Sequence, residues 1–463
     1  MMRHRLTTSL AGAVLALAFT PVLDAQSLSA RSPKTTTPPS PAFTFAVMLD
    51  TDQDAQLVAD LVDAELIASN MTSNLHLFRA QEDLSPKQQK SMLEQIGQLP
   101  QVVFSEPDGL VDLPETGSCS VLTGNVGAQQ CTIPFVDGTP TLGEWDGQDN
   151  LAPIKYQWAN WLADSLVHTG AAVVAVLDTG LDYDHPTVAD QVHSLGHDFL
   201  TNQPGAFESA DALDNDFDGF VDEAYGHGTH IASTITLINP KAQIMPLRVV
   251  DSDGNGNAFA LACAIFYAVD NNADIINLSL SMQEPSLCVA AAIEYAQFAG
   301  VTVISSAGNT SGEVLFPSTY DPAMLGVLLP FLPEWYTPHA EVLSVAGIAP
   351  GQTKASFSAF GSDVKVVAPA VDIYGAMPGH SFAWWSGTSQ ACAVASGVAS
   401  LLVSVGAGLE DGLPMPVIDL VMDTAQTIDP LNEEYVGQLG AGRVDAWFAA
   451  AAVLLSPDPP TDD

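Results

Sequence analysis

The chain has 463 residues, of which 47% are hydrophobic, so it is long enough to bury at least one substantial core. Its 13 Lys and Arg are outnumbered by 54 Asp and Glu, which gives a formal net charge of −41 at pH 7. Nucleic acids and anionic membranes require clustered cations, so we expect neither as a partner. The excess of acidic residues predicts a solvated, negatively charged surface suited to high salt. The alternative interpretation is that some of these carboxylates bind calcium.

The first 25 residues have the layout of a secretory signal peptide. Two arginines precede a largely apolar run from Leu6 to Leu23, and small residues follow at Ala25 and Ala30. We expect cleavage after Ala25, with Ala30 as the alternative, and therefore a secreted or periplasmic protein. A transmembrane anchor is the competing interpretation, but polar residues and a proline interrupt the run. No membrane contact is expected after the signal is removed.

Residues 26–41 predict a linker, because they are too rich in Pro and Thr to hold regular structure. A small unit over residues 42–108 follows. Its pattern predicts strands over 43–49, 74–80 and 102–105, and helices over 54–68 and 86–99. Alternating strands and helices in so short a stretch indicate a small α+β sandwich.

Residues 109–150 are rich in turn-forming residues and predict an irregular linker. The five cysteines suit an oxidising compartment but are too few to form the main scaffold. Cys119 and Cys131 flank a short loop, so we expect them to pair. Cys263 and Cys288 are candidates for a second bridge, which leaves Cys392 as a small buried residue.

Residues 151–455 alternate short apolar runs with helical patterns. The runs that predict strands are 172–178, 243–251, 274–281, 301–309 and 342–348. Helices are predicted over 392–404, 417–425 and 444–455, and residues 456–463 form an acidic tail. Continuous apolar strands between helices indicate an α/β fold, with a parallel sheet covered by helices on both faces.

Three segments carry residue types that serve nucleophilic catalysis. An apolar strand ends at Asp178, where functional groups collect in a parallel sheet. Residues 226–230 read Gly-His-Gly-Thr-His, and the glycines let other groups approach the imidazole closely. Ser389 opens a helix, where free N–H groups stabilise developing negative charge. The simpler interpretations are helix caps for the Asp and the Ser, and a zinc pair at His227 and His230.

In chain order, these segments resemble the acid, histidine and serine motifs of the subtilisin-like serine proteases, the subtilases. The matching motifs are Asp178-Thr179-Gly180, residues 226–232, Gly387-Thr388-Ser389, and Ser306-Ala307-Gly308-Asn309, which is similar to the segment carrying the family's oxyanion-hole Asn. The resemblance covers about residues 150–455. It implies a subtilisin-like fold and a serine endopeptidase that hydrolyses protein or peptide substrates through an acyl-enzyme intermediate.

The resemblance also implies roles for individual residues. Ser389 is the nucleophile, His227 is the general base, and Asp178 orients the imidazole. The Asn309 amide and the Ser389 N–H would donate to the oxyanion. The substrate-binding positions carried over are Ser279, Leu280, Ser281, Ala307 and Gly308. Ser281 stands where a Gly is common in the family, and Leu315 is expected near the pocket floor, so we expect a preference for small or medium apolar side chains.

By the same resemblance, residues 42–108 are the family's propeptide, an intramolecular inhibitor that is removed at a site between about 109 and 150. We expect a monomer. After the nucleophile, Gln390-Ala391-Cys392-Ala393-Val394 replace the family's usual Met-Ala-Ser-Pro-His. A catalytically weak or inactive binding protein on the same fold is therefore the alternative. Sedolisins share the Gly-Thr-Ser motif, but they use a Glu base and lack the histidine segment.

An acidic segment just before His227 suggests a metal site. Residues 214–223 read Asp-Asn-Asp-Phe-Asp-Gly-Phe-Val-Asp-Glu, and acids at alternate positions before a Gly resemble the start of an EF-hand loop. We expect the four aspartates Asp214, Asp216, Asp218 and Asp222 to hold a structural calcium ion, with no metal required for the chemistry. A plain acidic turn and a calcium-dependent structural protein are the alternatives.

Overall fold

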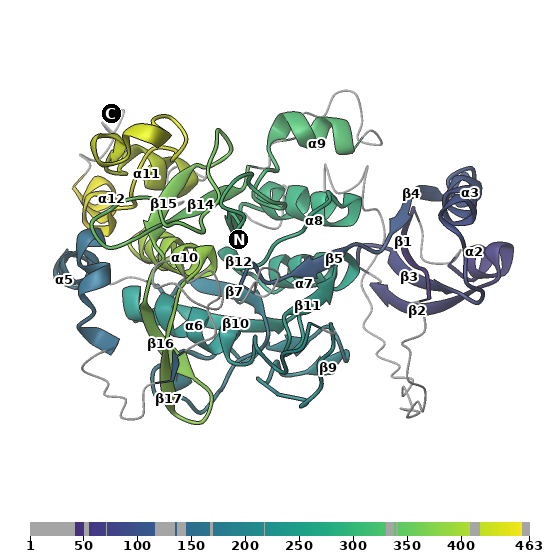
Figure 1. The fold of residues 1–463 in the computed structure, drawn as a ribbon, viewed down its shortest axis with the longest axis horizontal. Coiled ribbons are helices and arrows are strands. Elements are labelled where there is room, and N and C mark those ends of the chain that lie inside the picture. Colours follow the sequence, from purple (N-terminus) through teal and green to yellow (C-terminus); the bar gives the residue numbers. More distant parts are fainter. Residues whose placement is uncertain are drawn as a thin grey trace, which may run out of the picture. The chain divides into compact units, whose positions relative to one another are not determined.

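A computed structural model describes residues 42–50, 55–70, 72–115, 135–136, 145–166, 170–216, 218–329, 338, 341–407 and 417–455. The chain divides into two compact units, with the boundary between Asp108 and Gly109 (Figure 1). The predicted signal peptide, the linker 26–41, the pair Cys119 and Cys131, and the tail 456–463 lie outside the described residues.

The N-terminal unit is an antiparallel sheet with two helices. Its elements are β1 (Thr44–Leu49), α2 (Ala55–Val62), β2 (Ala64–Asn70), β3 (Leu75–Ala80), α3 (Pro86–Ile96) and β4 (Val102–Pro107), with the strand order β2-β3-β1-β4. Phe45 and Phe78 stack in its core with ring centroids 5.4 Å apart. Ser85 precedes α3, and its backbone N–H donates to the Gln88 side chain at 3.1 Å, which satisfies a free donor at the helix start.

The prediction of one continuous helix over residues 54–68 is wrong, because only its first half is helical. Helix α2 ends at Val62, Asp63 adopts a left-handed conformation with φ of 52°, and β2 follows at once. Residues of β2 pair with β3, for example Leu66 with Phe78. The apolar residues of this short stretch fit either periodicity, and pairing with the neighbouring strand decides between them.

The second unit is built on a sheet of eight strands, in the order β15-β14-β13-β12-β7-β10-β8-β9. These are β7 (Val173–Asp178), β8 (His197–Asp198), β9 (Gln203–Pro204), β10 (Gln243–Arg248), β12 (Ile275–Leu278), β13 (Thr302–Ser306), β14 (Leu343–Ile348) and β15 (Val366–Pro369). All neighbouring pairs are parallel except β8 and β9. The predicted α/β class with a parallel sheet is confirmed.

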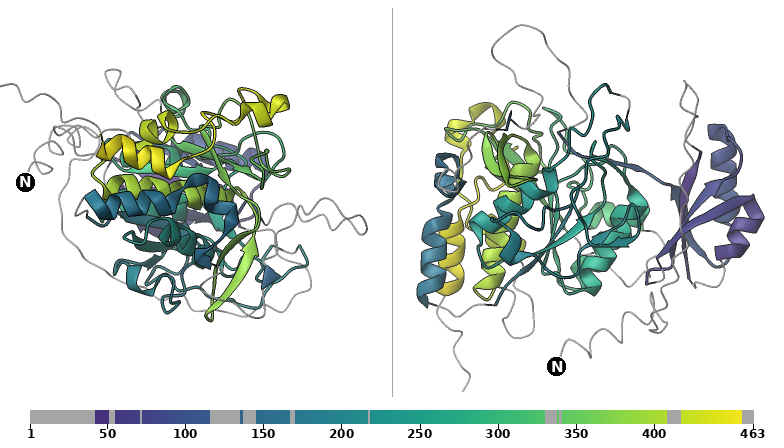
Figure 2. Two further views of the ribbon diagram at one scale, coloured as in Figure 1. Left: turned by 90° about the vertical axis from the view of Figure 1, so that its left-hand side faces the viewer. Right: turned by 90° about the horizontal axis from the view of Figure 1, so that it is seen from below.

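Helices flank the sheet (Figures 1 and 2). They are α5 (Tyr156–Leu166), α6 (His227–Ile238), α7 (Ala258–Asp270), α8 (Leu287–Phe298), α9 (Pro322–Leu328), α10 (Thr388–Ser404), α11 (Val417–Asp423) and α12 (Ala446–Leu454). Helices α6 and α10 pack together against the strands, and α7 packs against α8. A Cβ on Gly397 of α10 would lie 2.7 Å from the Ile238 side chain of α6, so glycine permits this close helix approach.

Shorter strands complete the unit. They are β5 (Leu110–Asp112), β6 (Phe135–Val136), β11 (Asn255–Asn257), β16 (Ile373–Met377) and β17 (Ser381–Trp385). Strand β5 pairs antiparallel with β11, and β17 lies between β16 and β6. The segment predicted as an irregular linker therefore contributes an ordered strand at residues 110–112.

The cysteine predictions have mixed outcomes. Cys263 and Cys288 lie on α7 and α8, and neither forms a disulfide within the described residues, so the predicted bridge between them is wrong. Cys392 is buried, as expected, and burial raises the pKa of its thiol to about 12. Among the described residues, no helix combines the length and the apolar character that a bilayer span requires.

Candidate active site

The strand β7 delivers Asp178 to the carboxyl edge of the parallel sheet. Its carboxylate is buried and accepts the Thr179 backbone N–H at 2.8 Å. Gly180 follows with φ of 130°, and a Cβ there would collide with the backbone of Phe207 and Glu208. Only glycine suits this turn, so the Asp-Thr-Gly motif sets the direction in which the acid points.

The N-terminus of α6 brings His227 to this acid. The imidazole Nδ1 lies 2.8 Å from Asp178 Oδ1 and 3.0 Å from Oδ2, and the ring is fully buried. Gly228 packs so tightly on the backbone of Gly180 that a Cβ would overlap it, and its N–H donates to Thr179 Oγ1 at 2.9 Å. The glycine beside the histidine therefore permits the close approach expected from the sequence.

Helix α10 begins four residues earlier than predicted, at Thr388, so Ser389 lies in its first turn. Ser389 is fully buried, and its hydroxyl lies 2.8 Å from Glu115 Oε2 and 3.0 Å from the Ser279 carbonyl oxygen. A hydroxyl carries one hydrogen, so it donates to only one of these acceptors at a time.

Asn309 is held in a fixed orientation by Thr388. Its Oδ1 accepts the Thr388 backbone N–H at 3.0 Å and the Thr388 hydroxyl at 2.9 Å. Two donors on the oxygen leave the amide nitrogen to face the nucleophile, where Nδ2 donates to Glu115 Oε1 at 3.3 Å. The structure therefore brings Asn309 and Ser389 together around a single carboxylate.

That carboxylate belongs to Glu115, a residue that the sequence analysis missed. Oε2 lies 3.6 Å from His227 Nε2, and Oε1 accepts the Ser389 backbone N–H at 3.4 Å. Nε2 forms no hydrogen bond within the described part of the chain. Ser389 Oγ and His227 Nε2 therefore both lie beside the same carboxylate oxygen, Glu115 Oε2. A lone Glu in a turn-rich segment carries no motif that could have revealed this position.

Two acids act on the protonation of His227. Burial alone lowers the pKa of this imidazole, but the Asp178 carboxylate and then Glu115 outweigh it and raise the pKa to about 10. His230 behaves in the opposite way, because burial and the nearby His227 lower its pKa to about 3. Its Nε2 donates to the Ile373 carbonyl at 3.1 Å, which leaves it poorly placed for the zinc pair considered above.

One of the residues predicted to bind substrate, Ser281, pairs with strand β5 on the edge opposite β11. Ser281 exchanges two backbone bonds with Asp112, at 2.7 and 2.9 Å. Ser279 donates its hydroxyl to the Ser389 carbonyl at 3.0 Å, and the Leu280 carbonyl accepts the Ser306 hydroxyl at 3.2 Å. These contacts fix segment 279–281 between the nucleophile helix and the bound strand.

The second predicted wall consists of Ala307 and Gly308. The Ala307 carbonyl accepts the Leu315 N–H at 3.0 Å, and a Cβ on Gly308 would lie 3.0 Å from the Leu315 side chain. The Leu315 side chain therefore lies directly against Gly308; its place near the floor of a substrate pocket stays a prediction.

Gln390 follows the nucleophile as a fully buried side chain, and neither of its amide atoms has a hydrogen-bond partner within the described residues.

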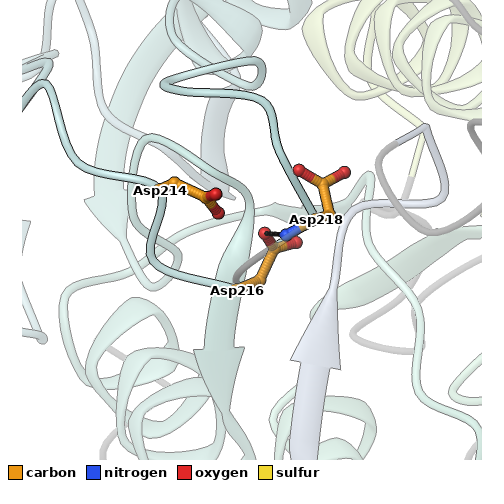
Figure 3. A group of neighbouring side chains, drawn as sticks. All are labelled: Asp214, Asp216 and Asp218. Carbon is orange, nitrogen blue, oxygen red and sulfur yellow. Dashed lines mark hydrogen bonds between the residues drawn. The ribbon is translucent and has the colours of Figure 1, made fainter. Parts of the chain in front are cut away.

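Three of the four predicted metal ligands meet in one turn. Ligand atoms of Asp214, Asp216 and Asp218 lie within 4.8 Å of one another, and the Asp218 N–H donates to Asp216 Oδ1 at 3.1 Å (Figure 3). Asp222 is not part of this group, since its carboxylate accepts the backbone N–H groups of residues 211 and 212 at 2.9 and 3.0 Å.

A further acid lies near this group. Glu223 has two buried carboxylate oxygens without a hydrogen-bond partner among the described residues. Burial, followed by the charges of Asp253, Asp218 and Asp216, raises its pKa to about 7. Clustered carboxylates with unused oxygens are the ligand type that a hard divalent cation prefers, so the residues present fit calcium.

Comparisons with known proteins show which family the chain resembles. A model of the subtilase family matches residues 169–442. A thermophilic serine proteinase from Bacillus sp. (strain AK1) is 33% identical over 244 residues, which cover 50% of this chain and 52% of that protein. Thermitase from Thermoactinomyces vulgaris is 33% identical over 245 residues, which cover 51% of this chain and 76% of that protein. The match with the first of these relatives thus spans only about half of its length.

Among solved structures, the chain is similar to fervidolysin from Fervidobacterium pennivorans, described as a keratinolytic enzyme related to subtilisin. The TM-score is 0.64 at 20% identity, over 92% of this chain and 63% of that one. At this identity the likeness concerns the fold. The family match, together with the Asp, His, Ser and Asn that the fold brings to one edge of the sheet, leads to one conclusion: the chain belongs to the subtilase family.

Proposed function

We propose that this chain is a secreted serine endopeptidase that cleaves protein or peptide substrates with Asp178, His227 and Ser389. The observation that carries the proposal is the convergence of donors on one anionic group. The Ser389 hydroxyl, the Ser389 N–H and the Asn309 amide all contact the Glu115 carboxylate. Donors arranged around a negative oxygen are what the oxyanion of a tetrahedral intermediate requires.

The chemistry follows from these positions. When a peptide carbonyl replaces the Glu115 carboxylate, Ser389 Oγ attacks the carbonyl carbon and its proton passes to His227 Nε2. Asp178 accepts the Nδ1–H of His227 and stabilises the imidazolium. The negative oxygen is held by Asn309 Nδ2 and the Ser389 N–H. Collapse of this intermediate sends the proton to the leaving amine and forms the acyl-enzyme, which water then hydrolyses by the same steps.

Structural calcium is part of the proposal. Asp214, Asp216 and Asp218 would hold the ion, and the unpartnered carboxylate of Glu223 is close enough for its charge interactions with Asp216 and Asp218 to raise its pKa. The ion would neutralise a cluster of like charges in the loop that precedes α6. It takes no part in the proton transfers, because these acids are separate from the residues that contact Ser389.

Residues 42–108 are proposed as the propeptide, removed after export that is directed by residues 1–25. Support comes from the compact α+β unit ending at Asp108 and from the family to which the chain belongs. We propose a monomer. Small or medium apolar side chains are proposed to be preferred before the scissile bond, because the bulky Leu315 packs on Gly308, one of the residues proposed to bind substrate.

The test is the reaction of Ser389 with a fluorophosphonate probe, combined with peptide hydrolysis. Wild-type protein freed of its N-terminal unit is expected to label and to hydrolyse peptides, and Ser389→Ala to do neither while it remains folded. Hydrolysis by Ser389→Ala at the wild-type rate would refute the assignment. Absence of labelling in the folded wild-type protein would favour the inactive binding protein instead.

A further inference from the structure

Residues 110–115 run as strand β5 (Leu110–Asp112) and then a turn at Pro114 and Glu115 toward the catalytic residues. Leu110 to Asp112 pair antiparallel with Asn255–Asn257 on one side, and Asp112 bonds to Ser281 on the other. The Leu113 N–H continues the pairing by donating to the Gly254 carbonyl at 3.2 Å. The side chains of Val111 and Leu113 are almost fully buried. Backbone bonds on both edges and buried alternate side chains are how a sheet edge binds an extended peptide.

The turn after β5 places the Glu115 side chain in the catalytic centre. This carboxylate contacts the nucleophile hydroxyl at 2.8 Å, two N–H donors at 3.3 and 3.4 Å, and the imidazole at 3.6 Å. Gly387 leaves the necessary room, because a Cβ there would overlap the Glu115 carboxylate. The carboxylate therefore fills the space and satisfies the donors that a substrate carbonyl needs.

We propose that the side-chain carboxylate of Glu115 is the group that closes this enzyme, bound as an internal anion in the oxyanion site. The inference rests on the proposed function and deepens it: it identifies the segment, the side chain and the class of ligand, a carboxylate. The blocking segment, residues 110–115, belongs to the second compact unit, so the closure does not require a particular placement of the N-terminal unit.

A carboxylate suits this task better than the peptide carbonyl it displaces. It presents a full negative charge to the donors of Asn309 and Ser389, as the oxyanion of the reaction does. Its carbon is a poor target for attack, because the charge is shared by both oxygens and no amine can leave. Glu115 thus binds to the machinery without being consumed by it.

The Glu115 carboxylate also keeps the general base, His227, in its protonated form. While Glu115 lies beside the imidazole, its negative charge adds to that of Asp178 in raising the pKa of His227, so the ring stays protonated at neutral pH. A protonated imidazole cannot take the proton of Ser389. Release of segment 110–115 would free the oxyanion donors and also return His227 toward its neutral form.

The test follows reaction of Ser389 with a fluorophosphonate in the full-length chain. Intact-protein mass spectrometry separates uncut from cut chains, so labelling of the uncut chain is read alone. We expect slow labelling of the wild-type uncut chain. Glu115→Gln retains the shape of the side chain but removes its charge, and its NH₂ group cannot accept hydrogen bonds from the N–H donors of the site. Segment 110–115 is then held less tightly, so we expect labelling to be about tenfold faster or more. The matched control Asp112→Asn, which removes a charge from the same strand, is expected to label no faster than wild type.

A second variant tests the carboxylate site directly. Glu115→Ala empties the site, so its uncut chain is expected to label fast in sodium chloride and more slowly in sodium acetate of equal ionic strength. Acetate is expected to leave the wild-type rate unchanged, because the site is already filled.

The outcomes separate this inference from the proposed function. Suppose that cut chains react with the probe and hydrolyse peptides, but that uncut wild type and uncut Glu115→Gln are labelled at equal rates. This result would overturn the inference and leave the proposed function intact. A Glu115→Ala chain that labels quickly but ignores acetate would overturn the carboxylate site. If no chain of any variant reacts, cut or uncut, then the proposed function itself fails, and the inference fails with it.

Discussion

Thr388 fixes the side-chain amide of Asn309 through two hydrogen bonds to one oxygen, at 2.9 and 3.0 Å. The Thr388 hydroxyl also accepts the Gly308 N–H at 3.2 Å, so it links the nucleophile helix to the segment after β13. The amide nitrogen is the only part of Asn309 left to serve the oxyanion. Orientation of this donor before the reaction is what makes it effective.

Thr388→Val tests this arrangement. The variant retains the backbone donor but loses the hydroxyl, so Asn309 gains freedom and kcat is expected to fall about tenfold with little change in KM. Steady-state kinetics on a peptide substrate measures the effect. Thr388→Ser, which keeps the hydroxyl, is the matched control and should retain most of the activity. If the Val and Ser variants have the same kcat, the hydroxyl does not position Asn309.

Asp178→Asn tests the orienting role of the acid. The amide preserves size, but it no longer accepts the Nδ1–H as a charged partner, so the imidazole loses its tautomer and its stabilising charge. We expect kcat to fall by about 10⁴, as for other triads of this type. Circular dichroism should show a folded protein. A fall of only a few-fold would indicate that Asp178 is a structural acid and that another group orients His227.

Much of this centre was predictable, because each motif couples a functional residue to glycines with a visible structural purpose. A Cβ on Gly228 would overlap the backbone of Gly180, and this close contact joins the turn after β7 to α6. Gly180 has no room for a side chain either, because a Cβ there would meet the backbone of Phe207 and Glu208. Asp178 and His227 therefore meet for reasons that local sequence expresses. The parallel sheet was predictable on similar grounds, since its strands are continuous apolar runs.

Glu115 was not predictable, because its place depends on pairing between distant segments. Strand β5 is three residues long and pairs with Asn255–Asn257, far along the chain. Nothing in residues 110–115 distinguishes them from a turn-rich linker. The same reason explains β2, which was expected to be helical: its partner strand, rather than its own periodicity, decides its conformation.

Removal of calcium should destabilise the protein. Asp214, Asp216 and Asp218 place three carboxylates within 4.8 Å, and like charges this close repel unless a cation lies among them. A chelator is therefore expected to lower the Tm of Ser389→Ala protein, which cannot cut itself, by several degrees, with recovery on adding calcium but not magnesium. Asp216→Asn should reduce the response.

The control for this experiment is Asp419→Asn, which removes an exposed acid from α11 and should respond to calcium as the parent does. A Tm that does not change with chelator or calcium would mean that residues 214–218 form a plain acidic turn. Equal calcium responses of the Asp216 and Asp419 variants would place the ion elsewhere.

The charge on His227 predicts how stability depends on pH in the closed chain. Its pKa is raised from 6.5 to about 10, so the folded state gains stability that is complete below pH 6.5 and is lost as the pH rises toward 10. The groups that face the ring are Asp178 of β7, Glu115 after β5, and the neutral His230 of α6. The Ser389→Ala chain is therefore expected to lose Tm between pH 7 and pH 10.

Unfolding also changes the charge of other groups in this range, so the informative quantity is a difference in Tm between variants. The Ser389→Ala chain should lose about 2 °C more than the same chain carrying His227→Gln, which has no imidazole to titrate. Adding Glu115→Gln instead should reduce the loss, because the imidazolium then has one acid fewer beside it. Parallel Tm profiles for all three chains would show that His227 is neutral in the closed state, and that Glu115 then blocks the site without holding the base in its protonated form.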